Sequence, residues 1–357
     1  MTAEEDRLLE QTLTKLFEEH SGPADRRRAE TEGWAPECWA SLVNSGLAWI
    51  GVPESAGGSG GDFLDARTLV RTAARHAVPL PLAECVLLGG WLVASAGLRL
   101  PDGPVSVPVP HAADTLTLTD GRLTGTLHRV PWGSRVTAIA AVAQSPDGDR
   151  VVLIEPAEAE IRPGRNVAGE PRDEVRLQSV PIPAGRTGPA TAGLREELTV
   201  RGALSRAILM AGAMDAVMTM TVSYAGQRHQ FGRPIGSFQA VAQRLVRLAS
   251  EAEAGYLAAE VAARHFAEAG TGAAFQVAMA KATACRTASE VITQSHQIHG
   301  AIGMTQEYAL HDFTRRLLVW RQEWGAERHW ATVVGAELAA RPGTALWPAI
   351  TTDLVTR

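Results

Sequence analysis

Cysteine is scarce in this chain. Its 357 residues include three cysteines, Cys38, Cys85 and Cys285, which are odd in number and far apart in the sequence. A disulfide framework or a structural zinc site needs cysteines that are more numerous and more closely spaced. We therefore interpret all three as thiols of the core or the surface, and we expect a protein of the reducing cytoplasm.

An excess of charge of one sign is also lacking. Lys and Arg number 34 and Asp and Glu number 39, which gives a formal net charge of -5. Proteins that bind nucleic acid usually present a broad basic field. We therefore expect no nucleic-acid partner.

The first hundred residues also lack an apolar run long enough to span a membrane. The most apolar early stretch, 85–98, is interrupted by Gly89 and Gly90 and is shorter than the roughly 20 residues that a membrane-spanning helix needs. The first residues, MTAEEDRLLEQ, are acidic and lead into no apolar segment typical of a secretion signal. We expect neither membrane insertion nor secretion.

Hydrophobic spacing divides the chain into parts. Apolar residues such as Leu13, Leu16 and Phe17 recur at helical spacing near the start, and long helical patterns return in the last half. Between them lie short alternating runs, in which Asp120–Gly121 and Asp147–Gly148 predict hairpins. This order predicts an α+β protein. Its expected parts are an N-terminal helical domain, a shortened β domain, a C-terminal helical bundle and a tail, at residues 1–100, 101–190, 191–341 and 342–357.

Two segments of the last part carry specific motifs. Residues 224–239 read YAGQRHQFGRPIGSFQ, and residues 297–303 read QIHGAIG. Both resemble signature segments of the acyl-CoA dehydrogenase family, in which an Arg, a Phe-Gly, a Phe-Gln and a Gln-x-x-Gly-Gly fall at this spacing. The weaker segments 47–58 (LAWIGVPESAGG) and 130–133 (VPWG) are similar to other parts of that family. The resemblance implies the family's fold: N-terminal helices, a small central antiparallel β domain and a C-terminal four-helix bundle.

The residue types in these motifs suit a dinucleotide. Gly232 and Pro234 predict a turn, so Arg228 and Phe231 are expected at the end of one helix and Gln239 in the first turn of the next. Arg228 offers a permanent charge and a planar fork of donors for a diphosphate. Phe231 could cover an adenine ring, and Gln239 offers both a donor and an acceptor. Taken alone, Arg228 also fits a surface salt bridge, and Phe231 and Gln239 also fit interior packing. The resemblance implies that FAD is the cofactor and that its adenosine diphosphate half, presented by a neighbouring subunit, is contacted by Arg228, Phe231, Gln239, Gln297, Gly300 and Ala301.

Two histidines flank Gln297. His296 and His299 could form a metal pair, but no carboxylate lies near them in the sequence, and such pairs are more often involved in packing or capping. We therefore expect no metal site. His299 stands where the family often has a hydrophobic residue, which gives the hypothesis that it touches the nucleotide.

The catalytic base is missing. In the family, a glutamate removes the α-proton of an acyl thioester while the β-hydrogen leaves as hydride to the flavin. Two positions for this glutamate are known in the family. Counted from Gln297, one falls on Trp324, with Glu323 one place early; counted from Arg228, the other falls near Gly202. Neither position carries a carboxylate, so no catalytic residue is assigned.

The β domain also lacks the family's Ala-Gly-Ser-Asp type of segment, which holds the flavin ring. We therefore expect a subunit that completes the FAD site of a homologous partner, in an α2β2 assembly. The resemblance to heteromeric actinobacterial enzymes implies an acyl-CoA substrate, such as a steroid side-chain thioester, and an electron-transfer flavoprotein as acceptor. Two alternatives remain: a homomeric dehydrogenase with a displaced base such as Glu323, and a non-catalytic scaffold or acyl-CoA binding subunit.

Overall fold

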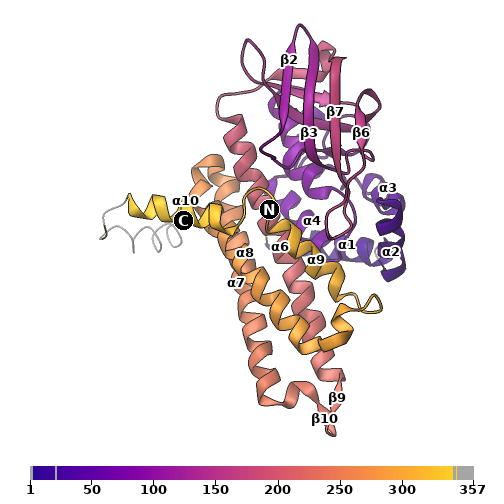
Figure 1. Cartoon of the computed structure of the whole chain (residues 1–357), viewed down its shortest axis with the longest axis vertical. Coiled ribbons are helices and arrows are strands. Elements are labelled where there is room, and N and C mark those ends of the chain that lie inside the picture. The colour runs from indigo at the N-terminus through magenta and orange to yellow at the C-terminus, as the bar shows by residue number, and fades with distance from the viewer. Residues whose placement is uncertain (1–2, 21, 341–342, 344–357) are drawn as a thin grey trace.

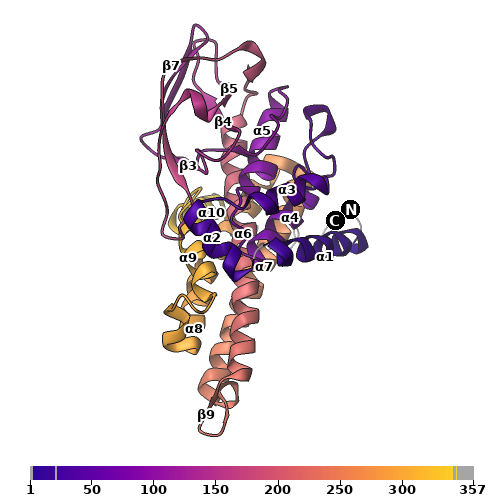
Figure 2. The same ribbon diagram turned by 90° about the vertical axis from the view of Figure 1, so that its right-hand side faces the viewer.

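The computed structural model describes residues 3–20, 22–340 and 343, so the tail predicted for 342–357 lies almost entirely outside the described residues. The β domain lies at one end, the N-terminal helices lie beside the middle, and a long helical bundle extends to the other end (Figures 1 and 2). The N-terminal helices are α1 (Ala3–His20), α2 (Pro23–Glu32), α3 (Pro36–Asn44), α4 (Phe63–Arg75), the π-helical segment Ala83–Gly89 and α5 (Gly90–Ser95).

Helix α4 begins at a capping box. The Asp62 carboxylate accepts hydrogen bonds from the backbone N–H groups of Leu64 and Asp65, and the Asp65 carboxylate accepts one from the N–H of Asp62. These bonds satisfy donors that a helix start otherwise leaves unpaired. They fix the point at which the glycine-rich segment before α4 ends, since Gly57, Gly58, Gly60 and Gly61 precede Asp62.

The β domain consists of two four-stranded sheets. Their orders are β1-β4-β5-β8 and β2-β3-β7-β6, and all pairs except the parallel pair β1–β4 are antiparallel. Asp120 and Gly121 join β2 to β3 with φ angles of 51° and 71°, as a primed hairpin turn requires. The strands are β1 (Val105–Ser106), β2 (Thr115–Thr119), β3 (Arg122–Pro131), β4 (Ala138–Ala143), β5 (Arg150–Ile154), β6 (Glu160–Arg162), β7 (Arg172–Pro181) and β8 (Thr187–Pro189).

The C-terminal bundle is built around one long helix, α6, which contacts α4, α7, α8 and α9. Gly212 of α6 allows close packing against α4, because a Cβ atom there would lie 2.2 Å from the carbonyl oxygen of Arg71. The predicted fold class, with helical N- and C-terminal parts around a small β domain, is confirmed. The helices are α6 (Leu194–Gln227), α7 (Gln239–Ala269), α8 (Ala274–His299), α9 (Leu310–Trp320) and α10 (Glu327–Ala339), which packs on α8 and projects sideways (Figure 1).

Helix α6 is the one described helix that is long and apolar enough to cross a membrane by length and composition. Its most apolar window is 56% buried within the protein. Met210 and Met214 are fully buried in the bundle core. The apolarity of α6 therefore matches its place at the centre of the bundle.

Candidate functional site

The first motif lies at the far end of the bundle from the β domain. Helix α6 ends at Gln227, Arg228 caps it, and the two-residue strands β9 (His229–Gln230) and β10 (Arg233–Pro234) form a tight hairpin (Figure 1). Phe231 at the tip has a φ of 52° and is 92% exposed. Gln239 starts α7, as predicted, and is exposed.

The second motif lies at the same end. Gln297 is in the last turn of α8, and Gly300 caps that helix with a φ of 63°. Helices α6 and α8 meet here, because the Tyr224 ring stacks on the His299 ring at a centroid distance of 4.4 Å. Both motifs, 75 residues apart in the chain at this contact, therefore share one end of the bundle. This proximity is what a single ligand contacted by both requires.

The predicted FAD-contacting residues face outward. Arg228, Gln239, Gln297, Gly300 and Ala301 are all exposed. Within residues 3–20, 22–340 and 343, the side chains of Arg228, Gln239 and Gln297 have no hydrogen-bond or ion-pair partner. The space beside Gly300 is open, with no atom within 4 Å of a Cβ built there. These donors are therefore available to a phosphate or adenine group, and the alternatives of a salt bridge for Arg228 and interior packing for Gln239 do not apply within this chain.

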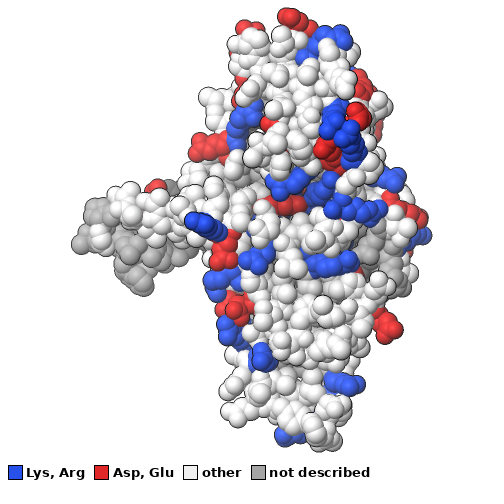
Figure 3. All heavy atoms as spheres, viewed as in Figure 1, with Lys and Arg blue, Asp and Glu red and all other residues white. Residues whose placement is uncertain are grey.

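Large apolar side chains accompany these donors. Val222 near the end of α6, Phe231, Val246 in α7, and Ile302 and Met304 after α8 are between 38% and 92% exposed. Figure 3 shows few charged side chains over the lower part of the bundle. Exposed apolar clusters of this kind usually mark a surface that another protein covers.

His299 is not part of this outward surface. Its ring is 4% exposed, lies between the rings of Tyr224 and Tyr308, and uses Nδ1 to contact the Ser295 carbonyl oxygen at 2.9 Å. His296 contacts the Thr314 hydroxyl at 3.1 Å. Burial lowers the pKa of both histidines. The hypothesis that His299 touches the nucleotide is therefore wrong in this conformation, because the ring is packed inside the bundle.

The two positions predicted for the base contact each other. A Cβ atom on Gly202 would lie 2.1 Å from Cδ2 of Trp324, so the indole ring occupies the space beside the glycine. Trp324 is 4% exposed and has a φ of 56°, a conformation that is unfavourable for a bulky side chain. Its carbonyl oxygen accepts a hydrogen bond of 2.8 Å from the Trp330 indole. The indole ring of Trp324 therefore occupies the space at the two positions where the resemblance predicts a carboxylate.

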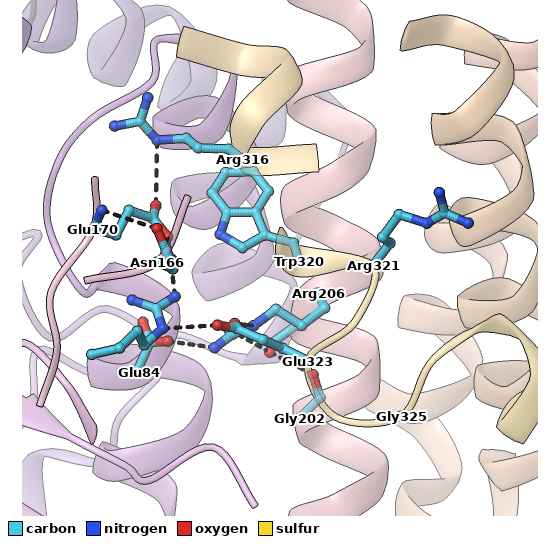
Figure 4. Close-up of polar contacts among 12 residues, drawn as sticks. Glu84, Asn166, Glu170, Gly202, Arg206, Arg316, Trp320, Arg321, Glu323 and Gly325 are labelled. Carbon is cyan, nitrogen blue, oxygen red and sulfur yellow. Dashed lines mark hydrogen bonds and ion pairs between the residues drawn. The ribbon is translucent and has the colours of Figure 1, made fainter. Parts of the chain in front are cut away.

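Glu323 is held in a buried cluster of ion pairs (Figure 4). Its carboxylate accepts hydrogen bonds from Nε of Arg172 at 2.8 Å and from Nε of Arg206 at 2.7 Å. Arg206 also donates to Glu84 at 2.6 Å, and Arg172 donates to Glu170 at 3.0 Å. We call the six buried residues Glu84, Glu170, Arg172, Arg206, Arg316 and Glu323 the charge cluster, in which Arg316 contacts Glu170 at 3.3 Å.

The charge cluster balances three carboxylates against three guanidinium groups and joins all three parts of the chain. Burial alone would raise the pKa of Glu323, but the charges of Arg172 and Arg206 outweigh burial and lower it to about 2. A general base needs a pKa closer to the working pH and access to the substrate. Glu323 has neither, so the alternative of a displaced base at this residue finds no support in the geometry.

Lys281 holds the segment 321–326, which carries Glu323 and Trp324. Its buried ammonium group donates to the carbonyl oxygens of Gly325 at 2.9 Å, Arg321 at 3.2 Å and Trp320 at 3.4 Å. Sequence reasoning missed Lys281 and Arg206. The signal available was a single charge inside an otherwise apolar helical run, which indicates a buried group with a specific partner.

The β domain offers no room for a flavin ring beside Trp132. This side chain is 3% exposed, and the Arg172 guanidinium lies 5.4 Å from its ring centroid. The Trp132 indole N–H has no acceptor among the described residues. However, the cavity that borders Trp132, Glu84 and Arg172 measures about 20 Å³, enough for about one water molecule. The residues present therefore fit the adenosine diphosphate half of FAD and not its ring.

A second cavity, of about 150 Å³, lies between α1, α4, α6 and α7. Both arginines of its lining have partners: Arg71 contacts Glu10 at 3.0 Å and the Tyr256 hydroxyl at 3.0 Å, and Arg75 contacts Asp215 at 2.7 Å. Glu253, a further charged residue of the lining, is exposed. Among the described residues, no cation of this cavity is therefore left for a phosphate. The candidate site therefore remains the exposed end of the bundle.

Comparison of the sequence with known proteins identifies the family. The family descriptions "Acyl-CoA dehydrogenase, N-terminal domain" and "Acyl-CoA dehydrogenase, C-terminal domain" match residues 3–97 and 196–336. The acyl-CoA dehydrogenase IpdE2 of Mycolicibacterium smegmatis is 31% identical over 317 residues, which cover 88% of this chain and 92% of that protein. The chain belongs to the acyl-CoA dehydrogenase family, whose members are FAD-dependent oxidoreductases that act on acyl-CoA.

Solved structures share the fold. The ChsE4–ChsE5 complex of Mycobacterium tuberculosis contains a chain that superposes with a TM-score of 0.88 at 23% identity, covering 96% of this chain and 99% of that one. A variant of the Tcur3481–Tcur3483 steroid acyl-CoA dehydrogenase gives a TM-score of 0.85 at 24% identity, covering 95% and 99%.

Proposed function

We propose that this chain is the subunit of a heteromeric acyl-CoA dehydrogenase that holds the adenosine diphosphate half of an FAD shared with a homologous partner subunit. The partner supplies the catalytic glutamate and the β domain that holds the flavin ring. The observation that supports this proposal is the packing of Trp324 on Gly202, because these are the two positions that the resemblance predicts for the base, and neither carries a carboxylate.

The roles of this chain's residues follow from their placement. The bound FAD would supply the acceptor for the hydride that leaves the substrate's β-carbon. Arg228 would donate to the diphosphate, Gln239 and Gln297 would hydrogen-bond the nucleotide, and Phe231 would cover the adenine. All four are exposed at one end of the bundle, where a partner's cofactor can reach them.

The two alternatives fit the residues less well. A homomeric enzyme needs a carboxylate at the thioester, and Glu323 is tied to two arginines. A scaffold or acyl-CoA binding subunit has no use for an exposed set of unpaired donors beside a protruding aromatic ring. We further propose a steroid side-chain acyl-CoA as substrate, an α2β2 assembly, an electron-transfer flavoprotein as acceptor and a cytoplasmic location. The resemblance to a named steroid enzyme supports the substrate.

The first test measures flavin content. The chain is purified alone and after co-expression with a homologous subunit that carries the glutamate, and FAD absorbance per chain is recorded for both. We expect little or no flavin in the lone chain and fewer flavins than chains in the complex. Stoichiometric FAD together with acyl-CoA turnover by the lone chain would contradict the proposal.

The second test places the cofactor. In the complex, Arg228→Ala should weaken FAD retention at least about tenfold, because a charge-assisted hydrogen bond contributes about 1.5 to 3 kcal/mol. Arg264→Ala is a matched control, since Arg264 is an exposed arginine of α7, 68% accessible, outside both motifs. Equal FAD retention by the two variants would mean that the nucleotide binds elsewhere.

A further inference from the structure

Three potential metal ligands lie together at the edge of the β domain. His111 and Asp114 belong to the connection that leads into β2, and His128 lies on β3, the strand that pairs with β2. Their ligand atoms all lie within 4.8 Å of one another. This group is far in sequence from His296 and His299, the histidines considered as metal ligands above.

Asp114 holds the group together through backbone hydrogen bonds. Its Oδ1 accepts from the N–H of His128 at 2.9 Å, and its Oδ2 accepts from the N–H of His111 at 2.9 Å. The connection is tied to β3 once more, because the N–H of Val109 donates to the carbonyl oxygen of Arg129 at 3.1 Å. The connection that carries His111 and Asp114 is therefore tied to β3, which pairs with β7 on both sides of a register irregularity between Leu127 and Val130.

A side-chain contact between His128 and Asp114 explains only part of this arrangement. Nδ1 of His128 contacts Oδ1 of Asp114 at 2.9 Å, and both side chains are partly accessible, so this contact stabilises little by itself. It does not account for His111, whose ring centroid lies 4.9 Å from that of His128. The ligand atoms of the two imidazole rings and of the carboxylate lie within 4.8 Å of one another, so one divalent cation can join them.

We propose that His111, Asp114 and His128 bind one divalent transition-metal ion, with Zn²⁺ as the preferred ion. Two imidazoles and a carboxylate are ligands that Zn²⁺ uses, whereas Mg²⁺ and Ca²⁺ prefer oxygen alone. Zinc–ligand bonds of about 2.0 to 2.2 Å separate tetrahedral ligands by roughly 3.3 to 3.5 Å. The observed group reaches this spacing through side-chain rotation, since His111 is exposed in a connection.

Two local features bear on the site. The N–H of Ala113 donates to Nδ1 of His111 at 3.3 Å, a long contact that the ring can release on binding. The Arg129 guanidinium donates to the Pro110 carbonyl oxygen, which places a positive charge near the connection, and Asp114 supplies the opposing charge. The three ligands leave a fourth tetrahedral position for water. The bound ion would clamp the connection between the two sheets onto β3.

The test is a Zn²⁺ titration of the full chain, prepared without a histidine tag and treated with a chelator, followed by calorimetry and metal analysis. We expect saturable uptake of one Zn²⁺ per chain and a visible Co²⁺ spectrum typical of tetrahedral coordination. Within the described residues the cysteines are buried and do not compete. His111→Ala/His128→Ala should abolish the saturable uptake.

Two single variants separate a metal site from general histidine binding. Asp114→Asn loses the charge and keeps one carbonyl oxygen, so one of the two backbone N–H groups loses its acceptor. This variant should weaken Zn²⁺ binding by at least about 10- to 100-fold. His329→Ala, which removes an exposed histidine of α10, should bind like the unmodified chain. The absence of saturable uptake by the unmodified chain, or equal uptake by it and the double variant, would overturn the proposal.

Discussion

Gly202 is a residue at which one added methyl group should clearly lower the stability of the fold. The Trp324 ring fills the space beside it, so the methyl group of Gly202→Ala would lie 2.1 Å from a ring carbon and displace the indole. Overpacking of this kind costs about 1 to 3 kcal/mol. We expect the free energy of unfolding, measured in urea, to fall by that amount.

Gly226→Ala is the matched control, because Gly226 lies on the same helix with no atom within 4 Å of an added Cβ. Its free energy of unfolding should stay the same or rise by up to about 1 kcal/mol. If both variants unfold at the same urea concentration, Trp324 is not packed on Gly202 as the structure shows.

Glu323 should matter for stability and little for chemistry. Glu323→Gln leaves Arg172 and Arg206 facing a neutral group in a buried site, and breaking such a pair costs about 3 to 5 kcal/mol. Glu196→Gln, which changes an exposed acid in the first turn of α6, should change stability by at most about 1 kcal/mol. Turnover per folded complex should be retained; a loss of turnover with unchanged stability would point to a catalytic Glu323.

The same residue gives a pH dependence. Its pKa in the folded state, about 2, lies below the ordinary 4.5, so its contribution to stability is present above about pH 5 and is lost as pH falls toward 2. The free energy of unfolding should therefore decline more steeply between pH 5 and 2 in the unmodified chain than in Glu323→Gln. Parallel pH profiles would show that the ion pairs do not form.

At the scale of the element, the conformation of the segment 321–326 between α9 and α10 depends on hydrogen bonds from Lys281. Lys281→Met keeps the side-chain length but removes the ammonium donor from three carbonyl oxygens. The oxygen of Arg321 keeps a contact with the Cys285 thiol at 3.3 Å. An unsatisfied buried polar group costs about 1 to 3 kcal/mol. Backbone amides of 321–326 should then exchange hydrogen at least about tenfold faster by mass spectrometry, whereas Lys15→Met, at an exposed lysine, should leave them unchanged. Equal hydrogen exchange in both variants would mean that Lys281 does not hold the segment 321–326 in place.

Elements with local signals could be predicted from the sequence. Gly232 and Pro234 end the pattern of α6, so Arg228 was expected at a helix terminus and Gln239 at the start of the next helix, and both lie there. The hairpin at Asp120–Gly121 follows from the same kind of local rule. The parallel pair β1–β4 was not predicted, because β1 is only two residues long and shows no recognisable alternation of apolar and polar residues.

At the scale of the whole molecule, contacts between distant parts escaped prediction. Trp324 and Gly202 were recognised only as positions without a carboxylate, and no periodicity indicates that residues so far apart would touch. The charge cluster is a similar case, since Glu84, Arg172 and Glu323 come from three different parts of the chain. The sequence predicts that the base is missing, and the tertiary structure packs Trp324 on Gly202 at the two predicted positions.

The last prediction concerns assembly of the complex. Phe231 is 92% exposed in the lone chain, so Phe231→Ser should leave its free energy of unfolding nearly unchanged. Truncating an aromatic side chain that a partner buries typically costs more than about 1 to 2 kcal/mol of binding, which corresponds to roughly tenfold or more in the dissociation constant of the two subunits. Val167→Ser is the matched control, because Val167 is 68% exposed in the β domain. Sedimentation of mixed subunits would measure both constants. Equal dissociation constants for the two variants would mean that the partner does not bind at the tip of the bundle. The shared cofactor would then not be held there either.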